Sequence, residues 1–308
     1  MKAMRFVQTA EGPGLVEGDA VQPAPGTGEV LVRVRAAGVT TTELLWSPTS
    51  HNKDGSARVG AIPGHEFSGV VAGVGDDVGS VEIGQQVFGM NDWYADGAMA
   101  EFCIAPFSSV APKPPKLSHV EAASIPIGAL TAWQGLFDHA NLQAGERVLV
   151  HGGAGAVGVF AIQLARVRGA HVIATASAGN VDFVASLGAE KVIDYKASRF
   201  EDSAKGVDVV FDTVGGETLD RSWGVLGPRG RLVTIVSGAD RAADKRVREA
   251  FFIMKPNRKQ LTEIAEMLEA GRMRAVVDTV IPLSQAADAF TGRVKRSGRG
   301  KIVVEVGG

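Results

Sequence analysis

A glycine-rich segment is the strongest chemical signal in this sequence. Residues 151–158 read HGGAGAVG, in which Gly153, Gly155 and Gly158 match the pattern GxGxxG. The segment follows an apolar run that is predicted to be a strand, and it leads into a predicted helix. In that context Gly153 permits a sharp turn, Gly155 leaves room for a pyrophosphate, and Gly158 lets the helix pack closely on the sheet.

The predicted helix extends from Ala156 to Arg168, so Ala156 and Val157 lie in its first turn and are candidate cofactor-binding residues. The first turn of a helix has unpaired N–H groups and carries the positive end of the helix dipole, so it attracts phosphate groups. The strand, the glycine turn and the helix together predict a dinucleotide site. The alternative is a tight turn between a strand and a helix that binds no ligand.

The end of the following strand indicates which dinucleotide is bound. Proteins that bind NAD usually have a carboxylate there, about 20 residues after the glycines, for the ribose 2′-hydroxyl. In this chain the position reads Ser177-Ala-Gly-Asn180 and has no carboxylate, and both Ser177 and Asn180 can donate hydrogen bonds to a 2′-phosphate. The sequence therefore favours NADPH. The loop itself has no basic residue, and Tyr195 and Lys196 are the nearest candidates in sequence.

Strands and helices alternate around this turn. Ser118 and Glu121 form a capping-box pattern that opens a helical region over 118–139. Repeated alternation predicts a parallel sheet covered by helices on both faces. The predicted strands are 147–151, 171–175, 191–194, 207–211, 230–236, 249–254 and 302–306, and the predicted helices are 156–168, 181–187 and 257–269, the last closed by Gly271.

The first third of the chain has a different pattern. Short predicted strands, such as 29–35 and 67–75, are separated by glycine and proline, which indicates a β-rich, loop-rich region. Pro112-Lys-Pro-Pro115 can continue neither a sheet ladder nor a helix interior, so it marks a boundary. A length of 308 residues is also typical of two domains.

Composition excludes several classes of protein. The chain is 45% hydrophobic and 21% charged with a formal net charge of -2, so we expect no binding to nucleic acid or to a membrane surface. The sequence has no apolar run long enough for a membrane span, and we expect a cytoplasmic protein. The single cysteine, Cys103, excludes an intrachain disulfide and a thiolate zinc cluster.

Taken in order, short motifs along the whole chain resemble the medium-chain dehydrogenase/reductase superfamily, in its zinc-lacking branch similar to quinone oxidoreductases. The resemblance implies an α/β fold: a GroES-like β-rich catalytic domain, 1–118 plus 281–308, with an inserted Rossmann domain with a doubly wound parallel sheet, 119–280. The motifs are Ala37-Gly-Val39 before a helix with Glu43, PGHEFSGVV from Pro63, GQQVFG from Gly84, GAMAEF from Gly97, LTAW from Leu130, DTVGG from Asp212 and GKIV from Gly300.

The resemblance also implies positions for the cofactor in a cleft between the two domains. It places Thr131 and Val214 near the nicotinamide half, and Ser237 and Phe252 beside the ring. It places Ser177, Asn180 and Tyr195 near the adenosine phosphate, and Lys301 close to the cofactor. Each of these side chains has a plain structural alternative, such as core packing for Phe252 or a solvated charge for Lys301.

Comparison with zinc-dependent relatives implies that this chain uses no metal. Those proteins bind zinc through Cys, His or Glu, and Cys. The chain retains His65-Glu66, but the first cysteine position falls at Thr40 and the later one near Ile127. A neutral threonine hydroxyl is a poor zinc ligand. We expect His65 and Glu66 to serve as hydrogen-bonding residues instead.

Without a Lewis acid, reduction of an activated acceptor is the chemistry that the sequence favours. A quinone or another planar activated carbonyl accepts hydride with its charge delocalised onto oxygen, which requires mainly alignment and a hydrogen-bond donor. Thr40 and Tyr94 are the candidate donors. Two alternatives stay open: an enoyl or alkenal reductase, and an NADPH-binding protein without significant turnover.

The run Phe251-Phe-Ile-Met254 adds an expectation about assembly. If it were a strand at a sheet edge, pairing with a second copy would bury it, which predicts a homodimer.

Overall fold

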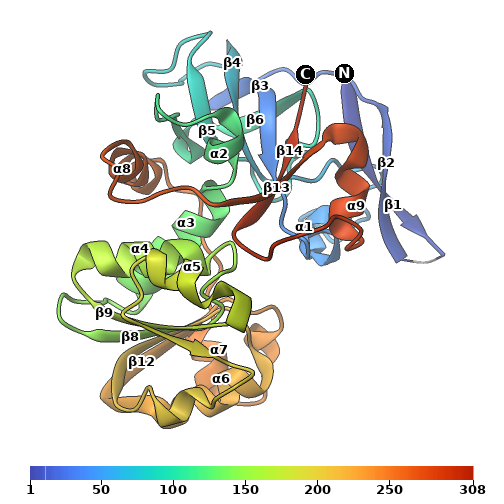
Figure 1. Ribbon diagram of the computed structural model, residues 1–308. Coiled ribbons are helices and arrows are strands. Elements are labelled where there is room, and N and C mark those ends of the chain that lie inside the picture. Colours follow the sequence, from blue (N-terminus) through green and yellow to red (C-terminus); the bar gives the residue numbers. More distant parts are fainter. Residues whose placement is uncertain (11, 308) are drawn as a thin grey trace. The chain divides into compact units, whose positions relative to one another are not determined.

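The computed structural model describes residues 1–10 and 12–307, which form two compact units. Unit 1 comprises Met1–Ile127, Pro256–Ser297 and the segment from Lys301 on, and unit 2 comprises Gly128–Lys255 and Gly298–Gly300. Figure 1 shows the elements of both. The mixed α/β class, with a β-rich unit and a parallel-sheet unit, is as the sequence predicted.

Unit 1 is built on a seven-stranded sheet with the order β13-β14-β3-β4-β5-β7, in which β6 also pairs with β3. A separate hairpin joins β1 to β2. The strands are β1 (Lys2–Thr9), β2 (Gly12–Asp19), β3 (Glu29–Gly38), β4 (Glu66–Val74), β5 (Gln86–Met90), β6 (Phe102–Pro106), β7 (Val110–Pro112), β13 (Val277–Pro282) and β14 (Lys301–Glu305). The helices are η1 (Glu43–Leu45), α1 (Ser47–Ser50), η2 (Phe107–Ser109), α2 (His119–Ala123), α8 (Arg258–Glu269), η8 (Leu283–Gln285) and α9 (Ala286–Phe290).

The core of unit 1 comes from the alternation within its strands. In β3, Val30, Val32 and Val34 are at most 1% exposed, while Arg33 and Arg35, on either side of Val34, are exposed. A period of two places every second side chain on one face of a sheet. The carboxyl-terminal strand β14 lies inside this sheet, parallel to β13 and antiparallel to β3. The end of the chain therefore folds into the same sheet as strands from the first third of the chain.

Unit 2 has a five-stranded parallel sheet with the order β10-β9-β8-β11-β12. In Figure 1, α4 and α5 cover one face, and α6 and α7 cover the other. The strands are β8 (Arg147–Val150), β9 (His171–Ala176), β10 (Lys191–Asp194), β11 (Val207–Asp212) and β12 (Leu226–Thr234). The helices are α3 (Pro126–Trp133), which begins two residues before the unit, η3 (Gln134–His139), α4 (Gly158–Arg168), η4 (Ala178–Asn180), α5 (Val181–Ser186), η5 (Phe200–Asp202), α6 (Gly216–Ser222), η6 (Trp223–Val225), η7 (Ala239–Arg241) and α7 (Lys245–Ala250).

The units divide at residues that differ from the predicted boundaries of 118 and 280. The stretch 256–280 belongs to unit 1, because β13 pairs with β14 and Arg258 at the start of α8 donates to the carbonyl oxygen of Val110. Helix α2, with the predicted capping box of Ser118 and Glu121 in place, also belongs to unit 1, where it contacts β3 and β4.

The prediction of a strand over 249–254 is wrong. Residues up to Ala250 complete α7, and the stretch after it joins the sheet only through a single bridge between Thr234 and Phe251. The side chains of Phe252 and Met254 are buried while Ile253 is 67% exposed, so the apolar pattern reflects packing of an extended segment and not a sheet ladder. The homodimer that was inferred from this run stays a prediction.

Candidate active site

The carboxyl edge of the sheet in unit 2 gathers most of the predicted cofactor residues. From β8 the chain proceeds to β9 and β10 on one side and then returns to β11 on the other, so the strand order reverses between β8 and β11. Ligands of open α/β sheets bind outside the carboxyl ends of the strands at such a reversal. The segments that leave these ends are 151–157, 177–180, 195–196, 213–215 and 235–237.

The glycine turn lies at this reversal. The left-handed backbone is at Gly152, with φ of +76°, and not at Gly153, so the sharp turn that we assigned to Gly153 belongs to its neighbour. Gly153 instead packs against the sheet and helices, where a Cβ would lie 3.1 Å from side chains of Ile162 and Val184.

The other two glycines have the geometry that the pattern predicts. Gly155 is exposed, and a Cβ there would have only the carbonyl oxygen of Gly152 as a neighbour, at 3.4 Å. Its bare Cα therefore leaves the turn open to a ligand. A Cβ on Gly158 would lie 2.2 Å from the same oxygen, so close approach of α4 requires glycine. Ala156 and Val157 are half-buried and precede the first residue of α4. The residues present fit a dinucleotide phosphate.

Buried polar side chains beneath the turn hold it in place. The two ring nitrogens of His151 lie 3.2 Å from Thr175 Oγ1 and 3.0 Å from Ser222 Oγ, and Thr213 donates its hydroxyl proton to the carbonyl oxygen of His151 at 2.7 Å. Burial lowers the pKa of His151 to about 4, so the ring is neutral near pH 7. The Thr213 bond joins the ends of β8 and β11, which fixes both sides of the reversal.

A basic residue that sequence reasoning missed lies at the end of β9. Arg299 donates from Nε to Asn180 Oδ1 at 2.8 Å and from Nη2 to the carbonyl oxygen of Gly179 at 2.8 Å, and its guanidinium lies over the ring of Phe183. Asn180 Nδ2 in turn lies 3.4 Å from Ser177 Oγ. No local signal links Arg299 to this loop, because 119 residues separate it from Asn180.

A short pairing holds Arg299 there. The Gly300 N–H donates to the carbonyl oxygen of Ala154 at 2.8 Å, and Gly300 forms a bridge with Gly155. The glycine turn and the β9 loop are therefore both contacted by the segment Gly298–Gly300.

The remaining predicted residues of unit 2 occupy varied positions. Tyr195 is 56% exposed after β10, Val214 is 52% exposed after β11, and Ser237 is exposed after β12. Thr131 is buried within α3. Phe252 is also buried, and its ring stacks on His139 with centroids 4.4 Å apart.

In unit 1, Thr40 and Lys301 belong to one polar cluster. Lys301 Nζ donates to Glu66 Oε1 and to Thr40 Oγ1, the latter at 3.5 Å. The other carboxylate oxygen of Glu66 accepts the N–H of Ile127 at 2.9 Å. Lys301 and Glu66 are at most 2% exposed, whereas Thr40 is half-buried. The structure thus brings Thr40 and Lys301 together, which their distance in sequence did not indicate.

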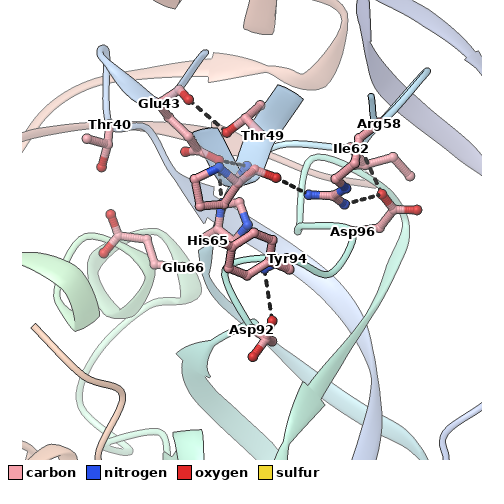
Figure 2. Close-up of polar contacts among 12 residues, drawn as sticks. Thr40, Glu43, Thr49, Arg58, Ile62, His65, Glu66, Asp92, Tyr94 and Asp96 are labelled. Atoms are coloured by element: carbon pink, nitrogen blue, oxygen red, sulfur yellow. Dashed lines mark hydrogen bonds and ion pairs between the residues drawn. The ribbon is translucent and has the colours of Figure 1, made fainter. Parts of the chain in front are cut away.

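His65 forms a separate pair with Glu43 (Figure 2). Its Nδ1 lies 2.6 Å from Glu43 Oε1, which also accepts the Gly64 N–H, and both side chains are at most 1% exposed. The predicted hydrogen-bonding roles of His65 and Glu66 are therefore present, each with its own partner.

Tyr94 lies apart from this cluster. It is 36% exposed, and its N–H donates to Asp92 (Figure 2). The ammonium of Lys53 lies 5.3 Å from its ring centroid. It lines an open hollow of about 600 Å³ with Asn52, Lys53, Asp54 and Asp92 among its walls. Within residues 1–10 and 12–307, no hydrogen bond joins Tyr94 to Thr40.

Comparison with known proteins identifies the family. An alcohol dehydrogenase GroES-like domain matches residues 26–115, and a zinc-binding dehydrogenase domain matches residues 187–304. The quinone oxidoreductase of Coxiella burnetii is 31% identical with a TM-score of 0.85, over 100% of this chain and 99% of that one. The chain belongs to the medium-chain dehydrogenase/reductase superfamily.

Two curated relatives show the range of this superfamily. The mitochondrial NAD(P)H oxidoreductase RTN4IP1 of Danio rerio is 32% identical over 90% of this chain and 84% of its own length. The 2-methylene-furan-3-one reductase of Solanum lycopersicum is 33% identical over 90% of this chain and 71% of its own length. This medium-chain dehydrogenase/reductase is therefore an oxidoreductase, and its relatives include proteins named as a quinone oxidoreductase, an NAD(P)H oxidoreductase and a 2-methylene-furan-3-one reductase.

In this medium-chain dehydrogenase/reductase, both carboxylate oxygens of Glu66 have protein partners. No three His, Cys, Asp or Glu side chains within 1–10 and 12–307 are grouped so that they could hold a metal ion. Glu66 accepts hydrogen bonds from the ammonium of Lys301 and from the backbone N–H of Ile127.

Within residues 1–10 and 12–307, no helix is both long and apolar enough to cross a membrane.

Proposed function

We propose that this protein is an NADPH-dependent reductase that transfers hydride to a quinone or to another planar activated carbonyl compound without a metal. The observation that carries the proposal is the open glycine turn at the strand reversal, together with an arginine and no carboxylate at the end of β9. When bound, NADPH supplies the hydride. The protein residues recognise the cofactor, align it with the acceptor and exclude water.

The choice of NADPH rests on Arg299. A 2′-phosphate requires positive charge and hydrogen-bond donors, and the guanidinium is always protonated. Two of its nitrogens bond Asn180 and Gly179, which fixes the plane of the group, while Nη1 has no partner within the described residues and is available to a phosphate oxygen. Ser177 and Asn180 add neutral donors beside it.

Within unit 1, Thr40 is the better candidate donor to the acceptor oxygen. It is half-buried, and it accepts a hydrogen bond from Lys301, which leaves its own proton free to donate. Tyr94 is a second candidate, in an open hollow where water competes for its hydroxyl.

Turnover assays test the proposal directly. Purified protein treated with a chelator is expected to oxidise NADPH with quinones, measured by the loss of nicotinamide absorbance. Faster turnover with alkenals would make it an enoyl or alkenal reductase; one relative, from Solanum lycopersicum, is named a 2-methylene-furan-3-one reductase. Tight NADPH binding without oxidation by quinones, alkenals or aldehydes would show a binding protein, and an absolute need for bound metal would contradict the mechanism.

The variant Arg299→Gln tests the cofactor. Loss of a charge-assisted hydrogen bond costs about 1.5–3 kcal/mol, so KM for NADPH is expected to rise by roughly 10- to 150-fold while KM for NADH changes little. Lys191→Gln, which changes an exposed residue at the amino end of β10, is the matched control and is expected to behave as wild type. Equal use of both coenzymes by the wild type would refute the assignment of NADPH.

A further inference from the structure

Lys301 and Glu66 form a buried ion pair in unit 1 that the proposed hydride transfer does not itself require. Both side chains are at most 2% exposed, and Lys301 Nζ donates to Glu66 Oε1. Two buried charges are costly to remove from water, and a pair of this kind adds little to stability compared with apolar residues of similar size. Stability alone therefore gives a weak reason for the pair.

The environment of Glu66 is built to keep Lys301 in place. Its second carboxylate oxygen accepts the Ile127 N–H at 2.9 Å, and Gly38 on the neighbouring strand provides the space, because a Cβ there would lie 2.6 Å from the carboxyl carbon. Complete burial raises the pKa of Glu66 above its ordinary value, and the ammonium of Lys301 opposes this. The charge of Glu43 raises it further. The carboxylate thus depends on the ammonium beside it.

Thr40 is the least buried side chain of this cluster. Lys301 Nζ lies 3.5 Å from Thr40 Oγ1, and Thr40 is half-buried whereas Lys301 is 2% exposed. The hydroxyl can accept a proton from the ammonium and donate its own to an oxygen on its open side.

We propose that Lys301 supplies a proton through Thr40 to the acceptor oxygen, with Glu66 as the fixed counter-ion. The inference rests on the proposed function, since a hydride acceptor must also take up one proton. As hydride arrives, the acceptor oxygen takes the Thr40 hydroxyl proton, and Thr40 Oγ takes one from Lys301 Nζ. The amine is left neutral and hydrogen-bonded to Glu66. After the product leaves, water returns a proton to Lys301 through the same hydroxyl.

Thr40→Val is the primary test, because it leaves the ion pair intact. Loss of a positioned proton donor typically costs about 10²–10⁴-fold, so we expect kcat to fall at least about 100-fold. The dissociation constant for NADPH, measured by protein fluorescence, is expected to stay within about threefold of wild type, and Thr40→Ser is expected to restore most of kcat.

A double substitution tests the contribution of Lys301. Lys301→Met with Glu66→Gln removes both charges, so neither is left buried without its partner. It is expected to lower kcat to a similar extent, and adding Thr40→Val should lower it no further, because groups that act as one chain are not additive. Lys295→Met, at an exposed lysine of the same unit, is the control and should leave kcat unchanged.

The outcomes separate this inference from the proposed function. If wild-type protein oxidises NADPH while Thr40→Val keeps more than half of kcat, the relay is wrong and the proposed function stands. The relay is also wrong if the fold-losses of kcat from Thr40→Val and from the double substitution multiply in the triple variant. It is equally wrong if the double variant keeps its kcat and loses only affinity for NADPH. If wild-type protein reduces no acceptor, the proposed function itself fails.

Discussion

At the scale of single residues, bare Cα atoms decide where the polar groups of this molecule can lie. Gly155 leaves the phosphate turn open, and Gly38 leaves room for the carboxylate of Glu66. The requirement at Gly38 is the stronger of the two, because the nearest atoms belong to a buried charged side chain that cannot move freely, whereas a Cβ on Gly155 would meet only the Gly152 carbonyl oxygen at 3.4 Å.

The variant Gly38→Ala tests that requirement. Its Cβ would lie 2.6 Å from the Glu66 carboxyl group, and overpacking of this kind costs about 1–3 kcal/mol of unfolding free energy. Gly73→Ala on the neighbouring strand is the matched control, because its nearest atom is a Leu31 carbon at the ordinary distance of 3.5 Å. Urea unfolding compares the two, and equal midpoints would contradict the argument.

At the scale of elements, two histidines tie strands and helices to their neighbours. His151 directly follows β8, and its ring nitrogens lie within hydrogen-bond distance of Thr175 on β9 and Ser222 on α6. His119 opens α2, and its Nδ1 lies 2.8 Å from Ser68 Oγ on β4. The pKa of both is lowered to about 4, mainly by burial, and for His119 the positive charges of Lys113 and Arg35 contribute to this value.

These shifts predict how stability depends on pH. In the unfolded chain the two rings have the ordinary histidine pKa of about 6.5, whereas in the folded chain their pKa is about 4. The stability that they contribute is thus complete above about pH 6.5 and is lost as the pH falls toward about 4. The urea midpoint of the wild type should therefore fall as the pH is lowered from about 6.5 to about 4, and it should fall less steeply in His119→Gln. The control His171→Gln changes an exposed ring on β9 and should follow the wild type.

At the scale of the whole molecule, the last residues of the chain serve both compact units. β14 lies inside the sheet of unit 1, where Lys301, Ile302, Val303 and Val304 are at most 2% exposed. The three residues before it belong to unit 2, where they contact the glycine turn and the β9 loop.

Truncation tests the importance of this tail. A chain that ends after Ser297 loses β14 and leaves the edges of β13 and β3 unpaired, so we expect it to be insoluble or unfolded by circular dichroism. A chain that lacks only the last two residues is expected to fold as the full-length protein does. A soluble, folded product ending at Ser297 would show that β14 is dispensable.

The sequence by itself determined the fold class, the superfamily, most strand positions and the glycine turn. The fold class and the glycine turn depend on local patterns, namely a period of two in β3, glycine at fixed spacing and a capping box at Ser118, whereas the superfamily follows from a resemblance carried by short motifs along the chain. The error over 249–254 arose because buried apolar residues in an extended segment have the same pattern as a strand.

Only the tertiary structure decided which distant residues meet. It placed Arg299 against Asn180 and Lys301 between Glu66 and Thr40, and it assigned the turn to Gly152 in place of Gly153. These contacts follow from backbone pairing and not from sequence distance: in unit 1, β14 pairs with β3, and in unit 2, Gly300 pairs with Ala154 and Gly155 in the glycine turn. Charges separated by more than a hundred residues leave no periodic signal in a sequence.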